Sequence, residues 1–224
     1  LLDAAHESKV DFLFEAAVAG GIPIIRPLKQ CLAGNHMTEV MGIVNGTTNF
    51  ILTKMTQEGM EFKDALALAT ELGYAEADPT ADIEGLDAGR KVAILASVAF
   101  NSRVVFNDVY TEGIAKITSK DIHYAKEMGR DIKLLGVARN EADGIEAYVC
   151  PMLIPSSHPL ATVNDSLMQY LSMEMQWRMP CSSEEEQENF LQPVQLWVMC
   201  LICEKYSCRM LRQNRMYLLQ EYPC

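Results

Sequence analysis

The apolar positions of this chain recur with helical spacing in several segments, and short continuous apolar runs lie between those segments. Apolar residues three or four positions apart mark the buried face of a helix, and a glycine directly after such a segment favours the end of the helix. The pattern predicts helices that begin after Asn45 and that span 62–72, 86–100 and 119–128, the last one capped by Ser119. Segment 86–100 is apolar almost throughout, so its helix is expected to be buried.

Runs rich in β-branched and aromatic residues predict strands over 10–18, 37–44, 132–138 and 148–154. Gly20 and Gly21 follow the first run and indicate a turn. An irregular helix is expected over 23–30, because Pro23 suits a first helical turn whereas Pro27 interrupts the helix. Strands and helices interleaved along the chain predict an α/β (α+β) fold in which helices cover a mixed sheet.

The acidic composition limits the possible partners of the protein. Its 224 residues carry 19 Lys and Arg against 30 Asp and Glu, a net charge of −11 that repels nucleic acid and anionic lipid surfaces. We therefore expect no nucleic-acid or membrane partner, and the sequence shows neither a long apolar stretch nor a basic leader, which favours a cytoplasmic protein. Seven cysteines without regular spacing argue against a secreted disulfide framework.

The stretch between two of the predicted helices concentrates carboxylates. Five lie between positions 76 and 87, namely Glu76, Asp78, Asp82, Glu84 and Asp87. Asp87 and Lys91 are four residues apart, which places them on one face of a helix, one turn apart. Carboxylates beside a positioned ammonium group suit a small cationic substrate and proton donation by Lys91. The alternative is an exposed acidic loop with a surface ion pair, but the apolar helix after Lys91 favours a buried setting.

Other candidate sites have weaker signals. Glu15 ends an apolar run before a glycine turn and is either a buried cation ligand, together with nearby carbonyl groups, or a surface residue. The four histidines are scattered without the spacing of metal ligands. Cys200 and Cys203 form a single CxxC pair near Cys208, which is weak evidence for zinc without a second pair. The sequence contains no glycine-rich phosphate-binding loop.

Three segments, 15–25, 42–52 and 71–95, carry a resemblance to a known family. The first reads E-A-A-V-A-G-G-I-P-I-I, the second G-I-V-N-G-T-T-N-F-I-L, and the third contains the acidic stretch and Lys91. In these long, ordered matches the chain resembles the catalytic and substrate-binding domain of homoserine dehydrogenase, over residues 10–166. That family reduces L-aspartate 4-semialdehyde to L-homoserine with NAD(P)H, in the biosynthesis of threonine and methionine.

The resemblance implies roles for individual residues. Lys91 resembles the family's proton donor to the aldehyde oxygen. The residues implied to bind the substrate are Glu76, Asp82, Asp87, Gly46 and Thr47. A monovalent cation, sodium, is implied at the Glu15 carboxylate and the carbonyl groups of Val18, Gly20 and Ile22. The resemblance also implies a nicotinamide cofactor, NADP or NAD, and a homodimer built through this domain.

Both ends of the chain depart from the family pattern. Residues 1–9 resemble the last part of the family's dinucleotide-binding domain, and the glycine-rich loop of that domain is not in this sequence. We therefore expect the chain by itself to lack cofactor binding and to be inactive in turnover. The alternative to a catalytic domain is a non-catalytic module that binds an amino acid or a cation and carries a cysteine-rich interaction tail.

The composition changes abruptly after Ser166. Residues 167–224 contain no Gly and no Asp, but they hold both Trp, seven of the thirteen Met and five of the seven Cys. The family's Phe-Asn-Ala-Val-Phe, written TTT-AAT-GCA-GTA-TTT and read from its second base, gives the Leu-Met-Gln-Tyr found at 167–170. Its later Phe-Phe-Gly-Arg-Gly-Ala-Gly-Glu-Phe, read in the same shifted frame, gives the sequence found at 182–190. We interpret 167–224 as a frameshifted translation, with a naturally divergent tail as the alternative.

A frameshifted last quarter would remove strands that complete the family's sheet, so an unpaired sheet edge and aggregation are expected. Sequencing the coding DNA tests the interpretation. Restoring one base near codon 167 is expected to recover the Gly-Arg-Gly-Ala-Gly run. If no single-base restoration recovers that run, the interpretation is wrong and the tail is divergent.

Overall fold

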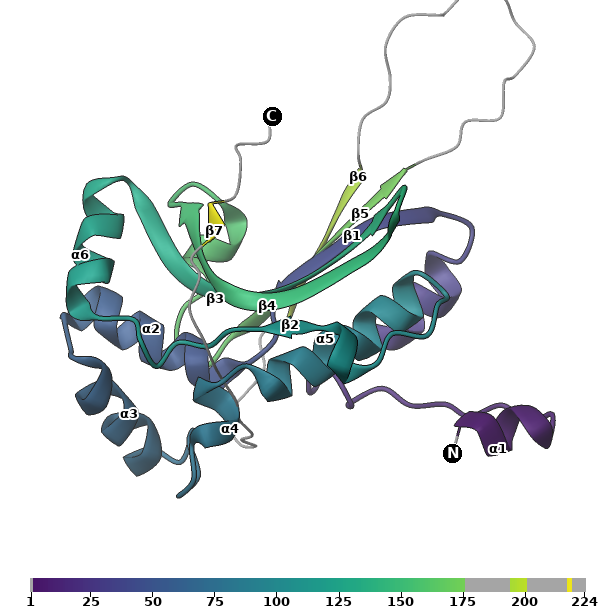
Figure 1. Cartoon of the computed structure of the whole chain (residues 1–224), viewed down its shortest axis with the longest axis horizontal. Coiled ribbons are helices and arrows are strands. Elements are labelled where there is room, and N and C mark those ends of the chain that lie inside the picture. Colours follow the sequence, from purple (N-terminus) through teal and green to yellow (C-terminus); the bar gives the residue numbers. More distant parts are fainter. Residues whose placement is uncertain (1, 176–193, 201–216, 219–224) are drawn as a thin grey trace, which may run out of the picture.

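A computed structural model of the chain describes residues 2–175, 194–200 and 217–218. Its centre is one curved sheet with the strand order β2-β4-β3-β1-β5-β6, and β7 pairs with β4 off this path. The strands are β1 (His36–Ile43), β2 (Tyr110–Thr111), β3 (Arg130–Glu141), β4 (Gly144–Pro155), β5 (Met168–Met175), β6 (Val194–Cys200) and β7 (Tyr217–Leu218). Figure 1 shows α2, α3 and α5 beneath one face of this sheet.

The α-helices are α1 (Leu2–Glu7), α2 (Gly46–Glu58), α3 (Phe62–Glu71), α4 (Thr80–Ile83), α5 (Leu86–Ala99) and α6 (Ser119–Glu127). Short helical turns complete the list, namely η1 (Pro27–Cys31), η2 (Phe106–Asp108) and η3 (Pro159–Thr162). The sheet is mixed, because β1 runs antiparallel to both β3 and β5 whereas β2 runs parallel to β4. The predicted α/β class, with helices covering a mixed sheet, is confirmed.

The helix boundaries follow the capping residues of the sequence. Asn45 caps α2 through its side chain, which accepts a hydrogen bond from the Thr48 backbone N–H, and Gly59 ends the helix with φ of 68°. The cap of α6 is Thr118 and not Ser119. The Thr118 hydroxyl accepts a hydrogen bond from the Asp121 backbone N–H, and the Asp121 carboxylate accepts one from the Thr118 backbone N–H. The predicted cap was therefore one residue too late.

One predicted strand is wrong. Residues 10–18 form no strand, and Val10 and Leu13 are 61% and 84% exposed. A run of β-favouring residues becomes a strand only where a neighbouring strand accepts its hydrogen bonds, and here the chain turns back instead.

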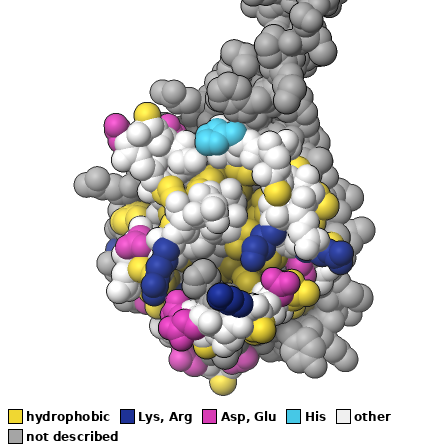
Figure 2. Space-filling view, turned by 90° about the vertical axis from the view of Figure 1, so that its right-hand side faces the viewer, with side chains coloured by type: hydrophobic (Ala, Val, Ile, Leu, Met, Phe, Trp, Pro, Cys, Tyr) yellow, Lys and Arg dark blue, Asp and Glu magenta, His cyan; other side chains and the backbone are white. Residues whose placement is uncertain are grey.

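Figure 2 shows one face of the molecule, on which apolar side chains lie among both acidic and basic ones, so the net charge forms no single-sign patch on this face.

The edge of β1 is paired, so the expected unpaired edge does not lie beside β1, and the expectation of an unpaired edge and aggregation stays a prediction. Strand β5 begins two residues after Ser166 and pairs antiparallel with β1 from His36 to Ile43, and β6 pairs with β5 in turn. The frameshift interpretation itself is a statement about the coding DNA and stays a prediction. Segment 182–190, together with Cys203 and Cys208, lies outside the described residues.

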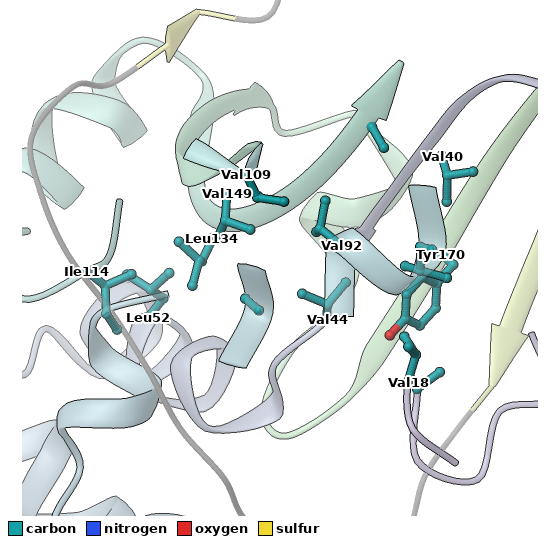
Figure 3. Packing of buried hydrophobic residues seen from close by; sticks show 14 of the residues in the cluster. Val18, Val40, Val44, Leu52, Val92, Val109, Ile114, Leu134, Val149 and Tyr170 are labelled. Carbon is teal, nitrogen blue, oxygen red and sulfur yellow. The ribbon is translucent and has the colours of Figure 1, made fainter. Parts of the chain in front are cut away.

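The main core lies between the sheet and the helices, and Figure 3 shows part of it. Leu52 of α2 and Val92 of α5 pack in the same cluster as Leu134 of β3 and Val149 of β4. As the apolar pattern predicted, α5 is largely buried. In the part of the chain that the structure describes, no helix has the length and apolar composition needed to cross a membrane.

Helix α5 lies close to the sheet at Gly136 of β3. A Cβ atom placed on Gly136 would lie 2.4 Å from Cγ2 of Val92, which is far closer than two carbon atoms can approach. Gly42 of β1 is the direct cross-strand partner of Gly136, but a Cβ atom on Gly42 would meet Tyr170 and the Gln169 carbonyl oxygen of β5 and not the helix. The contact between Gly136 and Val92 sets the height of α5 above β3, and Lys91 directly precedes Val92.

Gly136→Ala is therefore expected to destabilise the protein by about 2 kcal/mol, because the added methyl group overpacks the contact with Val92. Urea unfolding followed by circular dichroism measures this change. Gly34→Ala is the matched control, since no heavy atom lies within 4 Å of a Cβ atom at that position. Equal unfolding midpoints for the two variants would contradict the close approach.

Candidate active site

A buried polar network joins the start of α2 to α4 and α5. At its centre is Asn45, which is 3% exposed. Its Nδ2 donates hydrogen bonds to Oδ1 of Asp82 at 2.7 Å and to Oδ2 of Asp87 at 3.1 Å. Its Oδ1 accepts from the backbone N–H and the hydroxyl of Thr48, both at 2.9 Å. One asparagine thus holds two carboxylates that lie 37 and 42 residues further along the chain.

Lys91 forms the ion pair that the helical spacing predicted. Its Nζ lies 2.6 Å from Oδ2 of Asp87, and both side chains are about one-fifth exposed. Nζ also donates to the carbonyl oxygen of Val44 at 3.1 Å. An ammonium group has three N–H donors, so these contacts leave one donor for a substrate oxygen. The half-buried setting of Lys91 agrees with the apolar character of α5.

Asp82 is the most strongly perturbed acid at this site. It is 0% exposed, and burial raises the pKa of its carboxyl group to about 7. The hydrogen bond from Asn45 opposes this rise, the negative charge of Asp87 adds to it, and the positive charge of Lys91 opposes it. Its Oδ2 atom has no hydrogen-bond partner among the described residues. Two neighbouring carboxyl groups therefore differ in their surroundings: Asp87 forms an ion pair with Lys91, and Asp82 is buried with a raised pKa.

Gly46 and Thr47 form the first turn of α2 and not a loop. A Cβ atom on Gly46 would lie 2.8 Å from the carbonyl oxygen of Ser166, so only glycine fits between the helix and segment 163–167. The Thr47 hydroxyl donates to the carbonyl oxygen of Tyr74 at 2.8 Å. This contact ties the segment after α3 to the site. Backbone N–H groups of a first helical turn favour a negatively charged ligand.

A second buried cluster holds segment 163–167 against α2. Nδ2 of Asn49 donates, at 3.0–3.3 Å, to the carbonyl oxygens of Val163, Asp165 and Leu167. Nζ of Lys133, on β3, donates to Oδ1 of Asn49 at 3.1 Å and to the Val163 carbonyl oxygen at 2.5 Å. Burial lowers the pKa of Lys133 to about 8. The sequence analysis did not identify this lysine, because nothing in the apolar strand pattern of β3 marks it.

The remaining implied substrate residue is Glu76. Glu76 is exposed and follows buried Ala75 in the segment between α3 and α4. The structure therefore brings Asp82, Asp87 and Lys91 together around Asn45 and leaves Glu76 on the surface. Sequence reasoning treated Asn45 only as a turn and cap residue. Its signal was the N-cap position itself, where an amide has two donors that capping does not use.

The implied cation ligands form a separate group. Both carboxylate oxygens of Glu15 accept backbone hydrogen bonds, from Ile25 at 2.7 Å and from Arg26 at 3.1 Å. Val18 and Ile22 are fully buried, and between them the backbone turns sharply through Ala19 and Gly20, with φ of 65° and 55°. Each carboxylate oxygen keeps a second acceptor position beyond its hydrogen bond. Among the described residues, no three His, Cys, Asp or Glu side chains gather as a metal site.

Known proteins are similar to this chain in sequence and in fold. A family model described as homoserine dehydrogenase matches residues 23–176. Homoserine dehydrogenases of Corynebacterium glutamicum and Bacillus subtilis are 55% and 50% identical over 171 and 165 residues, each match covering 74% of this chain. The chain spans 38% of the length of these relatives. The solved structure of a homoserine dehydrogenase from Thiobacillus denitrificans is 42% identical with a TM-score of 0.77, over 88% of this chain and 43% of that one.

Asp82→Asn is expected to stabilise the protein above neutral pH relative to wild type. The folded-state pKa of Asp82, about 7, lies above the ordinary value of 3.8, so its contribution to stability is lost as the pH rises through 7. Asparagine keeps an oxygen for Asn45 and carries no charge. The difference between variant and wild type should grow by on the order of 4 kcal/mol between about pH 4 and about pH 8.

Urea unfolding at several pH values measures this difference. Asp64→Asn is the control, because Asp64 is an exposed residue in the first turn of α3. A difference between Asp82→Asn and wild type that does not change with pH would show that Asp82 is ionised throughout this range.

Proposed function

The chain belongs to the homoserine dehydrogenase family, and we propose that it supplies the substrate-binding and catalytic groups for the reduction of L-aspartate 4-semialdehyde to L-homoserine. The observation that carries the proposal is the Lys91 ammonium group, held 2.6 Å from Asp87 and 3.1 Å from the Val44 carbonyl oxygen, with one N–H donor left over. Reduction of an aldehyde needs a proton at the oxygen, and a positioned ammonium group provides one by general acid catalysis.

Lys91 donates its remaining proton to the aldehyde oxygen, which becomes the hydroxyl group of homoserine. Asp87 holds the ammonium group in place through the ion pair. The carbonyl group of Val44, at the end of β1, fixes a second N–H, so rotation of the ammonium group is restricted. Because the proton donor is held in place, proton transfer takes place within one complex and needs no diffusional encounter between donor and substrate.

The substrate carries both an ammonium and a carboxylate group, and the site offers a complement for each. The carboxyl groups of Asp82, with its unpartnered Oδ2, and of exposed Glu76 suit the ammonium group. The first turn of α2, at Gly46 and Thr47, offers backbone N–H groups and the positive end of the helix dipole to the carboxylate. With these groups fixed, the aldehyde end of the substrate is directed at Lys91.

A bound nicotinamide cofactor, NADP or NAD, would supply the hydride in its reduced form, NADPH or NADH. The sequence has no glycine-rich dinucleotide loop, so no residue of this chain is assigned to the cofactor. Glu15 and the carbonyl groups of Val18, Gly20 and Ile22 would hold a monovalent cation such as sodium, and this all-oxygen set suits a hard cation. The wider role that we propose is threonine and methionine biosynthesis in the cytoplasm, by a homodimer.

Lys91→Ala tests this function. It is measured by NADPH oxidation in a protein that carries this chain behind the family's dinucleotide-binding domain, with the reading frame restored from codon 167. Loss of the general acid is expected to lower kcat by about 100-fold or more, while binding of L-homoserine is largely retained. The matched control is Lys54→Ala, which removes the Lys54–Glu58 ion pair of α2 with the same four-residue spacing.

Unchanged turnover in Lys91→Ala would remove the proposed catalytic role. It would favour the non-catalytic module that binds an amino acid or a cation. A similar loss in Lys54→Ala would show that the effect is not specific to the site.

A further inference from the structure

The Asn45 side chain is shared between the two carboxylates of the site and the first turn of α2. Nδ2 donates to Asp82 and Asp87, and Oδ1 accepts two hydrogen bonds from Thr48. The opposite orientation of the amide would turn its oxygen toward two carboxylate oxygens and its nitrogen toward two donors. That arrangement is repulsive on both sides, so the network determines the orientation of the amide.

We propose that Asn45 is a positioning residue for Lys91: by donating to both carboxylates, it fixes the Asp87 carboxylate that holds the Lys91 ammonium group toward the substrate. The proposal rests on the proposed function and adds a residue to it. Asn45 itself need not touch the reacting atoms. It acts through Oδ2 of Asp87, the same oxygen that forms the ion pair with Lys91.

The second hydrogen bond of Asn45 explains why the two carboxylates can lie close together. Two carboxylates at short range repel each other, and the shared amide places a donor between them. Burial raises the pKa of Asp82 and the hydrogen bond from Asn45 lowers it, and the net pKa is about 7. The charged groups that influence Asp82 are Asp87 and Lys91, both on α5, and the polar groups are Asn45 and Thr47, both at the start of α2.

Other residues could cap α2 equally well without making this bridge. Serine and aspartate are both favoured at the N-cap, so capping does not by itself require asparagine here. Serine is too short to reach both carboxylates, and aspartate would place a third negative charge against two others. Only an amide both caps the helix and donates to the two acids. Capping and positioning can therefore be separated by substitution.

The test compares Asn45→Ser and Asn45→Asp with Thr118→Ala in the full chain. Thr118→Ala removes the N-cap of α6, far from the site, and controls for the loss of a helix cap. The ligand is L-homoserine, and its affinity is measured by isothermal titration calorimetry. The titration of the Asp82 carboxyl carbon and the signal of the Lys91 side-chain nitrogen are followed by NMR, independently of any ligand.

Both Asn45 variants are expected to bind L-homoserine at least about 10-fold more weakly, and Thr118→Ala to bind it as wild type does. The Asp82 midpoint should move upward in both variants by roughly one pH unit, since a hydrogen bond to the charged form is lost or replaced by repulsion. The Lys91 nitrogen signal should shift as well. Asn45→Ser retains the cap, so the test does not depend on Asn45→Asp being folded.

Two results would overturn the proposal. One is an Asp82 midpoint and a Lys91 signal that stay at their wild-type values in Asn45→Ser. The other is wild-type affinity in both variants when the wild-type chain binds L-homoserine. If the wild-type chain binds no L-homoserine, the proposed function fails, and the NMR measurements still decide whether Asn45 holds Asp87 and Lys91 together.

Discussion

The close packing of α5 on the sheet is the constraint on which the site depends. Gly136 leaves no side chain on the sheet surface beneath the helix, so Val92 rests almost on the backbone of β3. Lys91 is the residue before Val92, and its reach to the Val44 carbonyl group depends on that height. A helix raised by one methyl group would carry the ammonium group away from the end of β1.

Burial then separates the properties of two acids that are only five residues apart. Asp87 keeps partial contact with water and pairs with Lys91, whereas Asp82 is removed from water and its pKa rises to about 7. The difference arises from position and not from residue type, since desolvation penalises the charged form and a neighbouring ammonium group favours it. Asn45 links these two environments through one nitrogen atom.

The same helix that begins at Asn45 also organises the second half of the domain. Asn49, one turn further along α2, binds three carbonyl oxygens of segment 163–167, and buried Lys133 reinforces this contact from β3. That segment leads directly into β5, which covers the edge of β1. Pairing with β1 follows from backbone hydrogen bonds, which any sequence of suitable apolar pattern can form, so the altered composition after Ser166 is compatible with a strand there.

Local features of this protein were determined by the sequence itself. The four-residue spacing fixed the Asp87–Lys91 pair, since one helical turn brings such residues together whatever surrounds them. Apolar periodicity, capping and glycine signals located the start of α2 and both ends of α3 and α5 to within a residue. Only the tertiary structure decided the rest: the burial of Asp82, the link from Asn45 to carboxylates 37 and 42 residues away, and the failure of residues 10–18 to form a strand. These features depend on which distant segments meet, and no local pattern encodes that.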